Sequence, residues 1–165
     1  MDRLWAPWRM AYVAVERPVG CVFCQAPGDE DERRRLVLYR GETCFIIMNL
    51  FPYNGGHLMV VPYRHTSDLV GLTPEEQQEL MVLTRHAIRA LKESMRPDAF
   101  NVGMNLGRSA GAGIEEHLHQ HIVPRWHGDM NFMPVIGETR VLPEALLESY
   151  DKLKAAFDHI GMPQP

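Results

Sequence analysis

The chain has 165 residues, which is close to the size of one compact domain. Its composition, 45% hydrophobic and 23% charged, is typical of a globular protein rather than a disordered one. The net charge of −4 argues against a general binder of nucleic acid or membranes, because such proteins usually carry a basic surplus. A small anionic ligand is still compatible with this charge, because it needs only a local positive site.

The N-terminal residues and the cysteine count indicate a cytoplasmic protein. Three cysteines, an odd number, do not form the framework expected of a secreted disulfide scaffold. The first residues lack the apolar core of a signal peptide, and no apolar run reaches membrane-spanning length. We expect a single domain over 1–165, with an N-terminal arm over about 1–20 and a C-terminal helical extension over about 138–165.

Strand-forming segments follow a charged stretch, residues 28–35, which lacks an apolar period and is interpreted as a solvated loop. Short connections with turn-forming residues, such as Gly41-Glu42 and Asn54-Gly55-Gly56, favour antiparallel pairing of neighbouring strands. Composition predicts five strands, over residues 36–40, 43–49, 57–62, 100–106 and 117–124.

One clear helix lies between the third and fourth predicted strands. Thr73 is a suitable N-cap, and Pro74 suits the first helical position. Glu75 and Glu76 favour the positive end of the helix dipole, and Pro97 ends the helix. Its predicted apolar face comprises Leu80, Leu83, Ala87, Ile88, Leu91 and Met95.

A second, weaker helix is predicted over residues 143–157, with an apolar stripe of Leu146, Tyr150, Leu153 and Phe157. These elements give the fold class α+β, with an antiparallel sheet of about five strands backed by helices. His86, His127 and His159 are predicted to be surface residues, and Cys44 is predicted to lie in the core.

Three histidines alternate in the last predicted strand: His117, His119 and His121. Side chains alternate along a strand, so all three imidazoles are expected on one side of the sheet. Core packing is a poor explanation for three titratable rings on one face, because such clusters are typical of functional sites. This strand is therefore the main candidate for an active site.

Two kinds of chemistry are compatible with this pattern. His117 and His119 could chelate a catalytic metal that keeps an open position for water. Alternatively, one imidazole attacks a phosphorus atom while its neighbours stabilise the developing charge. The glycine-rich segment 107–113, with Arg108, favours phosphate chemistry, because glycines let backbone N–H groups approach phosphate oxygens closely.

The run His117-Leu118-His119-Gln120-His121-Ile122-Val123 resembles the signature of the histidine triad (HIT) family, in which alternating histidines precede two apolar residues. The segments 45–49 and 56–62 resemble the nucleoside-binding half of that family. The segments 4–10 and 124–132 are similar to its bacterial branch, which includes diadenosine tetraphosphate phosphorylases. The resemblance implies a HIT-like enzyme, hydrolase or nucleotidyltransferase, that cleaves dinucleoside polyphosphates through a nucleotidyl-histidine intermediate.

The resemblance also implies roles for individual residues. His119 matches the nucleophile, His121 the histidine that contacts the transferred phosphate, and His57 a buried histidine beside them. Asn49 matches the residue that binds the ribose hydroxyls. Phe45, Ile46 and Ile47 lie where the family builds its base pocket, and Asn105 resembles a polar residue that faces the phosphates. The glycine-rich segment supplies the other predicted phosphate contacts, Arg108, Ala112 and Gly113.

The sequence departs from the family pattern just before the histidine run. Many family members carry Gln-Ser or Gly-Ser there, whereas residues 112–116 offer backbone groups followed by Glu115 and Glu116. The second nucleophile, water or phosphate, therefore stays open at this stage, together with the preferred base and the length of the phosphate chain.

Cys21 and Cys24 form a Cys-x-x-Cys pair, which needs two more ligands to close a tetrahedral zinc site. His65 and His117 are the candidates, and the resemblance supports them because some HIT proteins bind zinc in this arrangement. A redox pair is the alternative, but the βαβ context that it requires is missing. We expect a structural zinc ion at these four residues and no organic cofactor.

Two other functions compete with a nucleotidyl-histidine enzyme. One is a metal-dependent hydrolase that uses the His117-x-His119 pair as catalytic ligands, and the other is a nucleotide-binding signalling module with little turnover. The resemblance further implies a homodimer with paired sheets and a nucleotide as the small-molecule partner. Neither a nucleic acid nor a membrane is expected as a partner.

Overall fold

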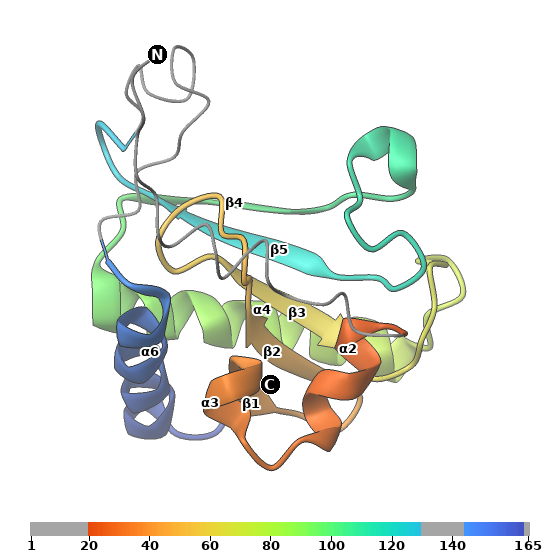
Figure 1. Ribbon diagram of the computed structural model, residues 1–165, viewed down its shortest axis with the longest axis horizontal. Coiled ribbons are helices and arrows are strands. Elements are labelled where there is room, and N and C mark those ends of the chain that lie inside the picture. Colours follow the sequence, from red (N-terminus) through yellow and green to blue (C-terminus); the bar gives the residue numbers. More distant parts are fainter. Residues whose placement is uncertain (1–19, 130–143, 164–165) are drawn as a thin grey trace, which may run out of the picture.

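The computed structural model describes residues 20–129 and 144–163 (Figure 1). The segment 4–10, almost all of the predicted N-terminal arm and the start of the predicted C-terminal extension lie outside the described residues. In the part that is described, no helix is both long and apolar enough to cross a membrane.

Five strands form one antiparallel sheet in the order β1-β2-β3-β5-β4, which confirms the predicted sheet and the α+β class. Every residue of β2 and β3 is buried, as their continuous apolar sequences predict for central strands. The strands are β1 (Val37–Arg40), β2 (Cys44–Met48), β3 (Leu58–Pro62), β4 (Ala99–Met104) and β5 (Gln120–Arg125).

The first four strands lie within two residues of their predicted bounds, but the fifth begins three residues later than predicted. The backbone before Gln120 makes other contacts than those of the sheet. The N–H of Leu118 donates to the carbonyl of Thr66, in the loop after β3, at 2.7 Å. The carbonyl of His117 accepts a hydrogen bond from the side chain of His119. The segment 117–119 therefore precedes the strand.

Helix α4 (Pro74–Met95) confirms the main predicted helix. Thr73 and Glu76 form a capping box, in which each side chain accepts a hydrogen bond from the backbone N–H of the other. The helix ends at Arg96, whose left-handed conformation (φ 49°) stops it directly before Pro97. Figure 1 shows α4 running behind the sheet, and it packs on β2, β3 and β5.

Helix α6 (Leu146–Ile160) confirms the weaker predicted helix within the described residues, and it ends three residues later than predicted. It packs against α4 and β1, and Figure 1 shows it crossing one end of α4. The hydroxyl of Tyr150 donates to the carbonyl of Val37 at 2.9 Å, which anchors α6 to the edge strand β1.

The charged stretch 28–35 is not only a loop, so that prediction is wrong in part. After the short helices α2 (Val22–Gln25) and η1 (Ala26–Gly28), one further turn forms, α3 (Glu32–Arg35). Asp31 caps it by accepting a hydrogen bond from the N–H of Arg34 at 3.0 Å. A single turn is too short to show an apolar period, and all of its residues remain at least partly exposed.

The prediction that His86 is a surface residue is also wrong, because its side chain is only 1% exposed. α6 packs on this side of α4, and the ring of Tyr39 from β1 also contacts it, so the helix has two buried faces instead of one. The rings of Tyr39 and Phe157 lie 5.0 and 5.1 Å from the imidazole. His127 and His159 are exposed and Cys44 is buried, as predicted.

Candidate active site

The third histidine of the run projects from the face of the sheet opposite α4. Gln120 points toward α4, since its Nε2 donates to Thr84 Oγ1 at 2.6 Å. Side chains alternate along a strand, so His121 projects from the other face. The strand register places His121 opposite Met59, and Met59 opposite Ile47. A row of side chains therefore crosses the sheet from β2 to His121.

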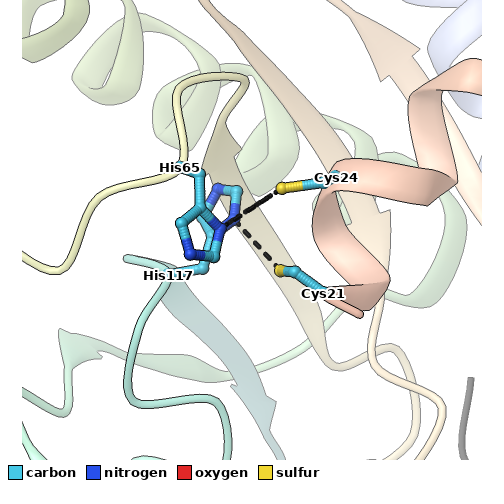
Figure 2. Close-up of side chains that lie close together, drawn as sticks. All are labelled: Cys21, Cys24, His65 and His117. Atoms are coloured by element: carbon cyan, nitrogen blue, oxygen red, sulfur yellow. Dashed lines mark hydrogen bonds between the residues drawn. The ribbon is translucent and has the colours of Figure 1, made fainter. Parts of the chain in front are cut away.

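The first histidine, His117, belongs to a group of four metal-ligating side chains, the Cys2His2 cluster. Figure 2 shows Cys21 directly before α2, Cys24 on α2, His65 after β3 and His117 before β5, all directed toward one point. Cys21 Sγ lies 3.3 Å from His117 Nδ1, and Cys24 Sγ lies 3.3 Å from His65 Nδ1. The two Nδ1 atoms are 3.2 Å apart.

These separations fit a tetrahedral zinc ion. Zinc bonds of about 2.05 Å to nitrogen and about 2.3 Å to sulfur imply roughly 3.3 Å between two nitrogens and roughly 3.6 Å between nitrogen and sulfur. The distance from Cys24 Sγ to His117 Nδ1 is 3.6 Å. The Nε2–H of His117 donates to the carbonyl of Pro62 at 2.8 Å, which leaves the lone pair on Nδ1 facing the cluster.

His119, the middle histidine, is held by the backbone of the first. Its Nδ1 lies 2.8 Å from the carbonyl oxygen of His117. A carbonyl only accepts hydrogen bonds, so the proton is on Nδ1 and Nε2 carries a lone pair. The side chain is 6% exposed, and the ring of Phe23 on α2 lies 5.0 Å away. Burial lowers the pKa of His119, so the ring is neutral at pH 7.

His57 and His121 form a second hydrogen-bonded arrangement, the histidine relay. The backbone N–H of Tyr53 donates to His57 Nδ1 at 3.0 Å, which fixes the proton of His57 on Nε2. That Nε2–H donates to His121 Nδ1 at 2.9 Å. His121 therefore carries its own proton on Nε2, a buried atom that has no hydrogen-bond partner among the described residues.

The relay and the middle histidine meet at one point. The ring centroids of His119 and His121 are 4.9 Å apart, with the rings nearly perpendicular at 78°. Burial, followed by the neighbouring His119, lowers the pKa of His121 to about 4, so this ring is also neutral at pH 7. The site thus places a nitrogen lone pair beside an N–H donor. This arrangement suits nucleophilic attack on a centre that carries anionic oxygens.

The residues predicted around the base lie on β2, but not all on one face. Ile47 is in the row that leads to His121, and Phe45 shares its face by strand alternation. Phe45 is fully buried and stacks on the ring of Tyr63 at 5.3 Å. Ile46 is opposite Val60, which pairs with Gln120, so Ile46 faces α4. The expectation that Ile46 lines the base pocket is therefore wrong, because its face of β2 packs on the helix.

Asn49, the predicted ribose ligand, follows β2 and stands beside the relay. Its Oδ1 accepts a hydrogen bond from the N–H of Phe51 at 2.9 Å, which shapes the turn after the strand. Its Nδ2 lies 3.4 Å from His57 Nδ1. The structure therefore places Asn49 beside His57, which is eight residues further along the chain.

The residues predicted around the phosphates occupy the loop between β4 and β5, which projects beyond the end of the sheet in Figure 1. Gly107 and Gly111 adopt positive φ angles of 82° and 89°, a region that favours glycine, around the short helix η2 (Arg108–Ala110). The loop continues directly into His117. Its members among the predicted contacts are Asn105, Arg108, Ala112 and Gly113.

Three groups that fix the histidines are missing from the sequence-based prediction. They are the ring of Phe23, the N–H of Tyr53 and the carbonyl of Pro62. Backbone groups give no signal in the residue types, so the last two cannot be found by pattern. Phe23 could have been suspected to pack on the histidines only because it is an aromatic residue between the two cysteines.

The sequence matches the HIT domain family over residues 30–128. It is 48% identical over 159 residues to a Mycobacterium tuberculosis protein named AP-4-A phosphorylase, covering 90% of this chain and 80% of the relative. It is 33% identical over 95 residues to the Schizosaccharomyces pombe protein named asymmetrical bis(5'-nucleosyl)-tetraphosphatase, covering 58% of this chain and 52% of the relative. A crystal structure of a Zn-bound histidine triad family protein from Mycobacterium smegmatis aligns with a TM-score of 0.68 at 31% identity, covering 86% of this chain and 95% of that one.

Proposed function

Since this chain belongs to the HIT domain family, we propose that it cleaves dinucleoside polyphosphates of the diadenosine tetraphosphate type through His119. The observation that carries the proposal is the lone pair of His119 Nε2 beside the Nε2–H donor of His121. The names of two relatives describe reactions on tetraphosphates of this kind.

In the first proposed step, His119 Nε2 attacks the α-phosphorus of the substrate. A nitrogen–phosphorus bond forms while the bond from phosphorus to the bridging oxygen breaks, and the electron pair of that bond leaves with the nucleoside polyphosphate. His121 Nε2–H donates to a non-bridging oxygen and stabilises its charge. The carbonyl of His117 stabilises the positive imidazole of the intermediate through Nδ1–H.

In the second step, we infer that inorganic phosphate attacks the nucleotidyl-histidine. An oxygen of phosphate forms a bond to phosphorus, the nitrogen–phosphorus bond breaks, and the electron pair returns to Nε2. The inference rests on the relative named a phosphorylase, which is more similar and matches more of this chain than the tetraphosphatase does. Diadenosine tetraphosphate then gives ATP in the first step and ADP in the second.

The products of diadenosine tetraphosphate, with and without inorganic phosphate, test this function. The proposal predicts ADP plus ATP with phosphate present. AMP plus ATP in both arms would make water the second nucleophile, and ADP alone would place the attack at a different phosphorus and contradict the proposal. Tight nucleotide binding without any product would instead favour the signalling module.

The remaining substrate contacts are assigned on the same basis. Ile47, in the row that leads to His121, and Phe45, on the same face, are assigned to the base. Asn49, beside His57, is assigned to the ribose. Four residues of the loop between β4 and β5 are assigned to the phosphates: Asn105, Arg108, Ala112 and Gly113.

We assign a structural zinc ion to the Cys2His2 cluster. Two thiolates and two imidazoles close a tetrahedral site, so the ion would hold α2 and the loop after β3 to the segment before β5 without acting on the phosphate. The separations of the ligand atoms and the Zn-bound relative support this assignment.

The same hydrogen bonds weigh against a catalytic metal shared by His117 and His119. His117 directs Nδ1 to the cluster and donates from Nε2 to Pro62. His119 donates from Nδ1 to His117. A chelating His-x-His site needs a free nitrogen lone pair on each histidine. Outside the cluster, His117 and His119 together offer one, on His119 Nε2.

We also propose a homodimer that pairs the two sheets at β4. Among the described strands this one is at the end of the sheet and pairs with β5 alone, and Val102 at its centre is 46% exposed. An open edge with exposed apolar side chains is suited to pairing with its symmetric copy. Val102→Lys should shift the sedimentation coefficient to that of a monomer, whereas Val70→Lys, at a 92% exposed loop position, should not. A monomeric wild-type protein at micromolar concentration would contradict the proposal.

A further inference from the structure

His86 is a buried polar side chain that the proposed reaction does not use. Its imidazole is 1% exposed and packs against the rings of Tyr39 and Phe157, which also stack on each other. Neither ring nitrogen has a hydrogen-bond partner among the residues that the structure describes. Buried polar atoms are normally hydrogen-bonded, so an imidazole with two unpartnered nitrogens indicates a group that occupies the space beside it.

A small cavity of about 20 Å³ adjoins this ring, lined by Val82, Arg85, His86 and Arg89. Roughly 10–15 Å³ is enough to hold one water-sized group. Arg85 and Arg89 are four residues apart on α4, so their side chains lie one above the other on the same side of the helix. The cavity therefore combines one buried imidazole with two guanidinium groups.

The two arginines bring positive charge that no acidic side chain in the described segments neutralises by an ion pair. Both side chains are exposed, so they are accessible from solvent. Burial, reinforced by the charge of Arg89, lowers the pKa of His86 to about 4. At neutral pH the ring is uncharged and offers one N–H donor beside two cations.

We propose that this cavity is a binding site for an oxyanion of the phosphate class, held by Arg85, Arg89 and an N–H of His86. Guanidinium groups bind oxyanions through paired, nearly parallel hydrogen bonds. The volume of the cavity admits one oxygen, to which His86 donates, while the other oxygens stay at the entrance with the two arginines.

The site is separate from the candidate active site. Thr84, two residues earlier on α4, faces the sheet and accepts a hydrogen bond from Gln120 beside the triad. His86 faces β1 and α6 instead, since its ring contacts Tyr39 and Phe157. The oxyanion would therefore bind on the other side of the helix, whatever reaction the triad of His117, His119 and His121 performs.

The test follows the imidazole NMR signal of His86 at pH 7 while inorganic phosphate is added at constant ionic strength. The His86→Phe variant identifies the signal by its loss. We expect a saturable shift in the wild type and in Lys92→Gln, and at least tenfold weaker binding in Arg89→Gln. Lys92→Gln is the matched control, because it also removes one exposed positive charge from α4 but does not line the cavity.

Further arms separate the alternatives. The shift should persist in His119→Ala, since the site does not involve the triad. A parallel titration with ATP tests whether the oxyanion can be the terminal phosphate of a nucleotide. A shift of the His86 signal with ATP would show that it can, whereas a shift with inorganic phosphate alone would identify free phosphate as the ligand. A signal that phosphate leaves unchanged, or a shift retained in Arg89→Gln, would overturn the proposal and leave bound water as the occupant. A response to chloride but not to phosphate would overturn the oxyanion class.

Discussion

The Cys2His2 cluster and the histidine relay with His119 are neighbouring groups, but they use opposite ring nitrogens. In the cluster, the Nε2–H of His117 donates to a carbonyl and Nδ1 faces the other ligands. In the candidate active site, the Nδ1–H of His119 donates to a carbonyl and Nε2 is available. The backbone carbonyl therefore decides the role of each ring, because the nitrogen that it does not engage keeps the lone pair.

The two regions also differ in what their loss should affect. The cluster joins segments that are far apart in the chain, and Cys24 within it is exposed. The relay is buried and fixes proton positions around His119. His117 belongs to both regions, through its side chain and its carbonyl respectively. Disruption of the cluster should therefore act first on stability, and disruption of the relay on rate.

The largest expected effect is that of His119→Ala. This change removes the proposed nucleophile, so kcat should fall by at least about 10⁴-fold. Binding of AMP should stay within roughly tenfold of the wild type, because the assigned base and ribose contacts lie on and after β2. Steady-state kinetics and calorimetry measure the two quantities. The exposed His159→Ala serves as control, and near-normal turnover without His119 would break the assignment.

Changes at His57 should show whether the relay acts through proton position. His57→Phe removes the donor to His121 Nδ1, so kcat should fall by roughly 10- to 100-fold, the cost of one unsatisfied buried group. His57→Gln retains an N–H donor and should recover part of this loss. Imidazole nitrogen NMR of His121 provides a second readout, since its tautomer should become mixed in His57→Phe. An unchanged tautomer would show that the relay does not set it.

Cys21→Ser tests the other side of the comparison. Loss of a metal ligand should cost about 3 kcal/mol of unfolding free energy and lower Tm by roughly 6–12 °C in a domain of this size. Turnover measured well below Tm should fall by less than about threefold, because the cluster does not contact the phosphate. Calorimetry with elemental analysis measures this, and Cys44→Ala is the control that should keep its zinc. Loss of turnover without loss of stability would reverse the assigned roles.

The smallest effect concerns pH. Burial lowers the pKa of His86 and of His121 to about 4, below the ordinary value of about 6.5. Between these values the unfolded chain binds protons that the folded chain does not, so the free energy of unfolding decreases as pH falls from about 6.5 toward 4. Urea titrations measure the free energy of unfolding at pH 7 and pH 5. Between these two values it should fall by about 1–2 kcal/mol less in His86→Phe than in the wild type. An equal loss in both proteins would show that His86 does not contribute to the pH dependence of stability.

Much of the fold follows from local patterns in the sequence. Helix α4 is predictable because Thr73, Pro74 and the apolar period mark its start and its buried face. The central strands are predictable because both of their faces are apolar. His86 defeats the same reasoning, since its burial depends on α6, which packs against α4 from a distant part of the chain. The spacing of Leu83, His86 and Ala90 was the available signal for a second buried face.

The candidate site was predictable in its residue types but not in its proton positions. Alternation in the segment 117–121 identifies the histidines, and Cys21-x-x-Cys24 identifies half of a metal cluster. The start of β5 is displaced because the carbonyl of His117 accepts from a side chain instead of pairing in the sheet. Long-range backbone contacts, such as the carbonyl of Pro62, leave no trace in the local sequence.

The proposed reaction depends on a covalent intermediate on His119, which rapid quenching can trap. The protein is mixed with diadenosine tetraphosphate without inorganic phosphate, quenched in alkali to preserve the nitrogen–phosphorus bond, digested and examined by mass spectrometry. We expect one AMP unit on His119, which disappears on addition of phosphate and appears as ADP. Continued turnover with no adduct, or an AMP unit on His117 or His121 instead, would contradict it.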